Sequence, residues 1–290
     1  MMGIIHSPIL QRLWNIPLNP LNHCSRLSRV EFTRLFSAAL GVALGLLSTF
    51  AMPVAISAQQ SAQSGLTLKK AAEGLFEIGV GTSLDVVTES EKTLNLLNRH
   101  FDFMTPENCM KPQAVGPNSG LMDFAQTDRY FDFAKKHNKK VVGHCLVWAK
   151  DDRTPPWFFK DGDQPVSRDV LMRRMERYIE TMVGRYGDEV DQWDVVNEAL
   201  EDGPEVWRDS GWRRAFNGSE FIVRAFEVTH QADPTATLIY NDYRSELDSK
   251  RPDLLKLLNY LQSKKAPVHA VGLQGHYELD SVRMKNSIKR

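Results

Sequence analysis

The sequence predicts an α/β fold of the TIM (β/α)8 barrel class, incomplete, with about six of the eight βα units present. Short apolar runs, each typical of a buried parallel strand, alternate six times with longer segments of helical periodicity. Such alternation indicates parallel strands joined by crossover helices. Several of the runs end abruptly in polar residues, and the carboxyl ends of the strands form the active face of a barrel.

The composition is that of an ordinary globular protein. The 290-residue chain is 42% hydrophobic and 25% charged, and Lys plus Arg equals Asp plus Glu at 36 each. The sequence therefore offers no basic field suited to a nucleic acid. The sequence contains no Gly-rich phosphate loop and no His/Cys metal spacing, so it implies no cofactor and no metal. A neutral partner fits this balance best.

Residues 1–58 are predicted to be an N-terminal extension and signal peptide. An apolar run of sixteen residues, 35–50, follows Arg26, Arg29 and Arg34 and precedes small residues that end at Ala58. This order is typical of a secretory signal cleaved after about Ala58. The alternative is a transmembrane anchor, but the run is shorter than the roughly 20 residues of a span. We expect a secreted protein, extracellular or periplasmic, without stable membrane insertion after cleavage.

Residues 59–67 are predicted to be a polar linker, and residues 68–290 a partial barrel. The expected strands are 76–80, 101–105, 141–148, 192–197, 237–241 and 270–276. The expected helices are 68–74, 85–100, 126–140, 168–186, 221–232 and a segment marked by Leu254, Leu255, Leu258 and Leu261.

Each expected element has a local reason. Gly79 and Gly81 leave room for backbone near the mouth of the barrel. The segments 85–100 and 126–140 carry one apolar face, which suits helices outside a sheet. The clearest helix is 168–186, whose apolar residues recur at intervals of three and four before Gly187 ends it.

Residues 192–200 read Gln-Trp-Asp-Val-Val-Asn-Glu-Ala-Leu and are the most informative stretch. A buried strand here delivers Asn197 and Glu198 at its carboxyl end. Glycoside cleavage requires a carboxylic acid that protonates the leaving oxygen, and a hydrogen bond to the sugar 2-hydroxyl helps further. The alternative is a structural Glu paired with an Arg or Lys.

Four further segments accompany this stretch: Thr-Pro-Glu-Asn at 105–108, Gly-His-Cys-Leu-Val-Trp at 143–148, Asn-Asp-Tyr at 241–243 and Gly-Leu-Gln-Gly-His at 272–276. Together with 193–198 they occur in the order found in glycoside hydrolase family 10, the endo-β-1,4-xylanases. The sequence resembles this family from about residue 66 to residue 276.

The resemblance implies retaining hydrolysis of xylan or another β-1,4-linked polysaccharide. It implies that Glu198 is the acid/base and Asn197 the clamp on the 2-hydroxyl. The other substrate-binding residues that it implies are Glu107, Asn108, Lys111, His144, Trp148, Gln274 and His276. Two departures from the family pattern are Pro112-Gln113 after Lys111, and Ala149 where the family commonly has His.

The second carboxylate of a retaining enzyme is expected to be absent from the chain. In the family, the nucleophile is the Glu of a Thr-Glu-Leu-Asp segment on the seventh strand. Glu278-Leu279-Asp280 shares three of these letters, but it follows His276 directly and belongs to the loop after the sixth strand. Asp242 is a candidate for an improvised second carboxylate, although we expect a structural role. The chain as it stands is therefore expected to be inactive.

Two other functions remain open. One is a non-hydrolytic xylan-binding or vestigial protein, in which the sugar-facing residues survive without the chemistry. The other is a different barrel β-glycanase, such as a cellulase or mannanase. A disulfide bond between Cys109 and Cys145, which follow adjacent expected strands, also remains open.

Overall fold

The structure is a computed structural model that describes residues 65–118, 121–203, 205–245 and 247–276. The expected extension and signal peptide at 1–58, the linker up to residue 64 and the segment around Glu278 lie outside the described residues.

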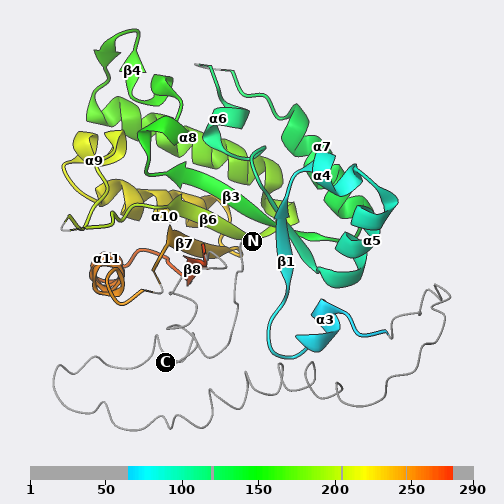
Figure 1. Cartoon of the computed structure of the whole chain (residues 1–290). Helices are drawn as coiled ribbons and strands as arrows, with labels where there is room; N and C mark the ends of the chain where they lie inside the picture. Colours follow the sequence, from blue (N-terminus) through cyan, green and yellow to red (C-terminus); the bar gives the residue numbers. More distant parts are fainter. Residues whose placement is uncertain (1–64, 119–120, 204, 246, 277–290) are drawn as a thin grey trace, which may run out of the picture. The chain divides into compact units, whose positions relative to one another are not determined.

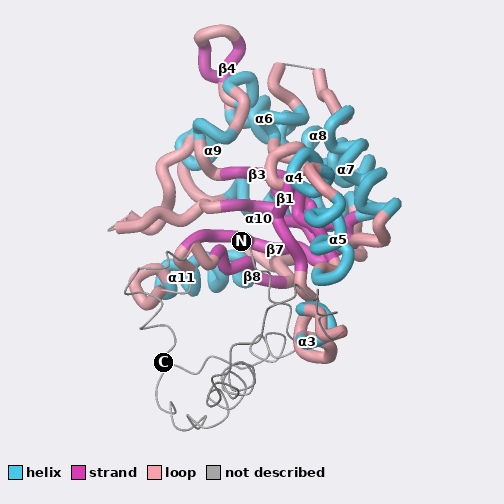
Figure 2. The backbone as a smooth tube through the Cα atoms, turned by 45° about the vertical axis from the view of Figure 1, so that its right-hand side comes forward, coloured by secondary structure: helices cyan, strands magenta, loops and turns pink. Residues whose placement is uncertain are grey.

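Six parallel strands form one sheet, with the order β1-β2-β3-β6-β7-β8. Figure 1 shows them side by side, and in Figure 2 strands β3, β7 and β8 lie one below another. Their bounds are Gly79–Thr82 (β1), Phe103–Pro106 (β2), Lys140–Trp148 (β3), Val190–Asn197 (β6), Thr237–Tyr243 (β7) and Ala270–Gln274 (β8). Because all six strands of this sheet run parallel, their carboxyl ends meet at one edge of the sheet.

Helices connect successive strands, which confirms the fold class: the six strands belong to an incomplete (β/α)8 barrel. The helices are α3 (Leu68–Ala71), α4 (Leu84–Thr88), α5 (Glu91–His100), α6 (Pro112–Val115), α7 (Ala125–Lys136), α8 (Arg168–Tyr186), α9 (Gly211–Phe216), α10 (Glu220–Ala232) and α11 (Arg251–Ser263). Helices α7 and α8 pack against β3, and α10 packs against β6, β7 and α8. In the part of the chain that the structure describes, no helix is long and apolar enough to cross a membrane.

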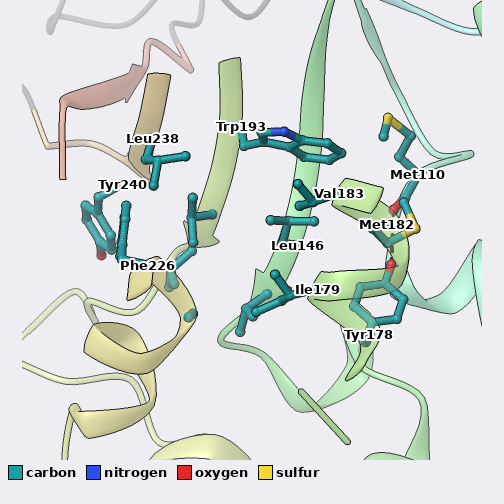
Figure 3. Close-up of a cluster of buried hydrophobic side chains, with 14 of the residues drawn as sticks. Met110, Leu146, Tyr178, Ile179, Met182, Val183, Trp193, Phe226, Leu238 and Tyr240 are labelled. Atoms are coloured by element: carbon teal, nitrogen blue, oxygen red, sulfur yellow. Dashed lines mark hydrogen bonds between the residues drawn. The ribbon is translucent and has the colours of Figure 1, made fainter. Parts of the chain in front are cut away.

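The main core lies between the sheet and these helices. Figure 3 shows Trp193 of β6 and Leu146 of β3 beside Ile179 and Val183 of α8. Trp193 is fully buried. Its ring lies directly over Gly143, where an added Cβ would stand 2.3 Å from Trp193 Cε3. This close contact packs the middle of β3 against the middle of β6, immediately before His144 and Asp194.

Several local features differ from the expectations. The helix expected over 85–100 is two helices, because Ser90 accepts a hydrogen bond from the backbone of Thr93 and starts α5 anew. Helix α8 ends at Tyr186 with Gly187 as its cap, as expected, although Gly187 has φ −55° and begins a 3-10 turn instead of adopting a left-handed conformation. Helix α9 and the hairpin of β4 (Lys160–Asp161) and β5 (Gln164–Pro165) were not predicted.

Candidate active site

Glu198 follows the last residue of β6 and has a left-handed backbone, with φ +57°. Its N–H donates to the carbonyl of Asn241 on β7 (2.9 Å), and the N–H of Leu200 donates to Asp242 Oδ2 (3.2 Å). The chain therefore turns away from the sheet while it remains bonded to the next strand. A non-glycine residue in this region is strained, and the surrounding bonds are what maintain it.

The Glu198 carboxylate has two partners. Its Oε2 accepts a hydrogen bond from Trp148 Nε1 (3.1 Å) and lies 3.6 Å from Arg208 Nη1. The Glu198 side chain is 14% exposed, so it remains open to a ligand. The ion-pair partner that a structural Glu would have is thus present, but at a distance longer than a good hydrogen bond.

Asn197 presents an unused donor at the carboxyl end of the sheet. Its Oδ1 accepts hydrogen bonds from Asn241 Nδ2 (2.9 Å) and Gln274 Nε2 (3.0 Å), so the amide orientation is fixed by β7 and β8. Its Nδ2 is buried and has no partner within the described residues. A buried amide donor without a partner destabilises the fold by about 1–3 kcal/mol, which a ligand oxygen would offset. Gln274 is bonded in turn to His276, through Oε1 and Nε2 (2.8 Å).

His144 is held by Asp194, its register partner on β6. His144 Nδ1 and Asp194 Oδ2 are 2.7 Å apart, and both side chains are buried. Because the two ring nitrogens point in different directions, this bond directs Nε2 away from Asp194. The ring also packs edge-on against Trp148, with 5.9 Å between the centroids.

Two cations lie over the ring of Trp148, one of the expected substrate-binding residues. Lys111 Nζ is 5.0 Å from the ring centroid and the Arg153 guanidinium carbon is 5.5 Å from it. Lys111 also donates to Asn108 Oδ1 (2.9 Å). Burial is the main reason that the pKa of Lys111 lies below its ordinary value. Glu107 is exposed, and its N–H bonds to the carbonyl of Thr82 (3.1 Å), which ties this loop to β1.

Asp242 lies under the loop after β6. It is fully buried, it accepts a hydrogen bond from Tyr240, and its Oδ1 is 2.9 Å from Lys250 Nζ. Burial raises the pKa of Asp242, while Lys250 opposes that shift. The described contacts are those of a structural carboxylate rather than of one that faces a substrate.

The sequence matches the Glycosyl hydrolase family 10 profile over residues 67–290. The chain belongs to this family. It is 41% identical to endo-1,4-beta-xylanase A of Caldicellulosiruptor sp. (strain Rt8B.4) over 213 residues, which cover 71% of this chain and 31% of that protein. It is 38% identical to endo-1,4-beta-xylanase B of Paenibacillus barcinonensis over 212 residues, which cover 72% of this chain and 62% of that protein.

A solved structure of endo-1,4-beta-xylanase from Caldicellulosiruptor owensensis is 35% identical, with a TM-score of 0.71. That comparison covers 77% of this chain and 67% of the other. The chain thus spans less than two thirds of the length of the two curated family 10 relatives that it matches.

The family 10 fold brings most of the expected site residues together. Bonds link Glu198 to Trp148, Asn197 to Gln274, Gln274 to His276, and Lys111 to Asn108. Glu107 has no side-chain hydrogen bond within the described residues. Cys109 and Cys145 are free thiols, so the disulfide considered above is absent. Arg208 was missed, because neither a motif nor a periodic pattern distinguishes it from the other charges of its loop.

Proposed function

We propose that this family 10 chain supplies the acid/base and much of the sugar-binding site of an endo-β-1,4-xylanase, which hydrolyses the β-1,4-xylosidic bonds of xylan with retention of configuration, and that residues 59–290 by themselves are inactive. The observation that carries the proposal is the pairing of Glu198 with the unused Asn197 donor at the end of β6. A proton donor and a 2-hydroxyl donor side by side are what glycoside cleavage requires. The xylanases to which the chain is similar support the same reaction.

In this mechanism, the Glu198 carboxyl group gives its proton to the oxygen of the leaving sugar. The resulting carboxylate later takes a proton from the water that completes hydrolysis. Asn197 Nδ2 donates to the 2-hydroxyl oxygen. The hydrogen bonds that Asn197 Oδ1 accepts from Asn241 and Gln274 keep the amide group from rotating. A retaining reaction also needs a second carboxylate about 5–5.5 Å from the first, and we assign none among the described residues.

The remaining residues form the proposed sugar-binding shell. His144 is held in place by Asp194, and its Nε2 is the nitrogen proposed to contact a hydroxyl. The other proposed sugar-binding residues contact either the sugar hydroxyl groups or the apolar side of the sugar ring. They are Glu107, Asn108, Lys111, Trp148, Gln274 and His276. With Lys111 and Arg153 over the Trp148 ring, we propose that Trp148 acts mainly through its N–H rather than as a stacking platform.

The test is Glu198→Gln, which preserves shape and removes the proton donor. It is measured in residues 59–290 joined to the part of the Paenibacillus barcinonensis xylanase that follows its match. Residues 59–290 alone, in which no second carboxylate is assigned, should release no reducing sugar from xylan. Hydrolysis of unactivated xylan should fall by at least about 100-fold, the lower range for general acid catalysis. The matched control is Glu205→Gln, an exposed Glu on the same loop, which should keep the parent rate.

The same assay separates the alternatives. Cellulose and mannan serve as competing substrates, and a higher rate on either would replace xylan as the substrate. Retention of short xylo-oligosaccharides by both proteins without any hydrolysis would favour a binding protein. Equal xylan rates in the parent and the Glu198→Gln variant would refute the assignment of the acid.

A further inference from the structure

Arg208 occupies a position between two carboxylates of its own loop. Its Nη1 is 3.6 Å from Glu198 Oε2, and its Nε is 3.8 Å from Glu201 Oε2. The Arg208 side chain is only 10% exposed. Within the described residues, its single side-chain hydrogen bond runs from Nη2 to the Tyr243 hydroxyl (2.9 Å), and Nε has no hydrogen-bond partner. A buried guanidinium is thus within ion-pair range of both acids without a hydrogen bond to either.

Tyr243 fixes this arrangement from the end of β7. Its hydroxyl accepts from Arg208 and donates to Glu201 Oε1 (3.4 Å), so one group orients both members of the pair. Lys250 Nζ lies 3.4 Å from the centroid of the Tyr243 ring and holds it in turn. Arg208 is also bonded through its backbone N–H to the carbonyl of Ala199, the residue after Glu198 (3.0 Å).

An acid that must both give and regain a proton changes charge during each turnover. A cation fixed beside it favours the carboxylate and would oppose the return of the proton. Glu201 removes this conflict, because its carboxylate can take the guanidinium when Glu198 is protonated. A guanidinium has enough donors to move between the two without breaking its bond to Tyr243.

We propose that Arg208 is a positioning residue for Glu198 and that Glu201 is its alternating partner; the proposal rests on the function given above. When the Glu198 proton passes to the leaving oxygen, the new carboxylate pairs with Arg208. When a water proton returns to Glu198, Arg208 pairs with Glu201. No further proton donor or acceptor is needed.

The first test does not depend on activity. The Trp148 indole N–H donates to Glu198, so its ¹⁵N–¹H resonance in the full chain, assigned with Trp148→Phe, reports where that carboxylate lies. Arg208→Met should move this resonance most of the way to its position in Glu198→Ala, and Arg208→Lys should move it less. Arg214→Met removes a neighbouring, half-exposed guanidinium and should leave it unmoved. The Trp157 indole, bonded to the carbonyl of Gly116, is an internal reference.

The second test is kinetic and uses the form of the enzyme that hydrolyses xylan. Arg208→Met and Glu201→Gln should each lower the rate on xylan by about 10- to 100-fold, the scale of a misplaced catalytic group. A dinitrophenyl xylobioside needs no proton for its leaving group, so its bond-cleavage step should change little. The double variant should be no slower than Arg208→Met, because the two residues act as one unit.

The outcomes are distinct. An unmoved Trp148 resonance in folded Arg208→Met overturns the positioning role whether or not xylan is hydrolysed. Additive losses in the double variant overturn the alternation. If Arg208→Met does not fold, Tyr243→Phe removes the same anchor and should give an intermediate shift of the resonance. If neither the parent protein nor any variant cleaves xylan, the proposed function is refuted. The shift of the Trp148 indole resonance then tests the positioning role of Arg208 by itself.

Discussion

At the scale of single residues, the contact between Gly143 and Trp193 shows how the core sets the position of the site. Gly143 immediately precedes His144, and Trp193 immediately precedes Asp194. The glycine allows the indole to lie flat against β3, and this brings the next residue of each strand within hydrogen-bonding distance. The absence of a side chain at Gly143 therefore allows the buried pair of His144 and Asp194 to align.

Gly143→Ala should therefore destabilise the protein. The new Cβ would meet three ring atoms of Trp193 at 2.3 to 2.9 Å, and the fully buried ring cannot move aside. We expect a loss of about 1–3 kcal/mol in the free energy of unfolding, measured by urea titration.

The matched control for this change is Gly184→Ala, in the last turn of α8, where no atom beyond the helix's own backbone lies within 4 Å of an added Cβ. That variant should be more stable by about 0.5–1 kcal/mol, because alanine favours a helix. Equal stability of the two variants would contradict the close contact at Gly143.

At the scale of elements, α7 and α8 are joined by an ion pair near opposite ends of the two helices. Asp128 lies in the first turn of α7, and Arg185 lies in the last turn of α8. The pair is bidentate, with 2.9 Å from Arg185 Nε to Oδ1 and 2.5 Å from Nη2 to Oδ2, and Tyr186 adds a hydrogen bond to Oδ1 (2.7 Å). Each charge also complements the dipole of its own helix.

These contacts, Arg185 first, lower the pKa of Asp128 below its ordinary value of 3.8. A carboxyl group with a lowered pKa stabilises the folded state above pH 3.8, and this contribution is lost as the pH falls through the folded pKa. Asp128→Asn should therefore cost stability at neutral pH, by less than about 1 kcal/mol because the pair is partly exposed.

The stability difference between Asp128→Asn and the parent should shrink as the pH falls below 3.8, when followed by urea titrations between about pH 7 and about pH 3. Asp132→Asn, an exposed Asp one turn further along α7, serves as the control. A difference that stays constant over the whole range would contradict the role of the Asp128 charge.

At the scale of the whole molecule, the sequence was sufficient for the features that depend on local pattern. The six strands and helix α8 were predicted because buried strands are apolar runs and α8 has seven buried residues at regular intervals. Short elements such as α9 and the β4–β5 hairpin carry too few residues for a periodic signal. Arg208 could not be predicted, because its place in the site depends on a hydrogen bond to Tyr243, which lies thirty-five residues later at the end of β7.

We further propose the domain division of the chain and its export: a signal peptide within residues 1–58, a linker at 59–67 and the barrel from residue 68. Residues 1–65 fused to a reporter should carry it across the cytoplasmic membrane, with cleavage near Ala58. The measurement is the N-terminal sequence of the exported reporter. Recovery of an uncut reporter in the membrane would favour an anchor instead.

The left-handed backbone at Glu198 places selection for thermal stability in conflict with selection for activity. Side chains other than glycine lose about 1–2 kcal/mol in that conformation, so a glycine at position 198 would relieve strain as it removed the acid. A directed-evolution screen that scores heat resistance alone would therefore tend to discard the carboxylate that we propose as the acid/base. In a lineage that no longer depended on xylan hydrolysis, the same gain in stability would favour the loss of Glu198. A glycine at position 198 would then be among the first substitutions to mark the loss of activity.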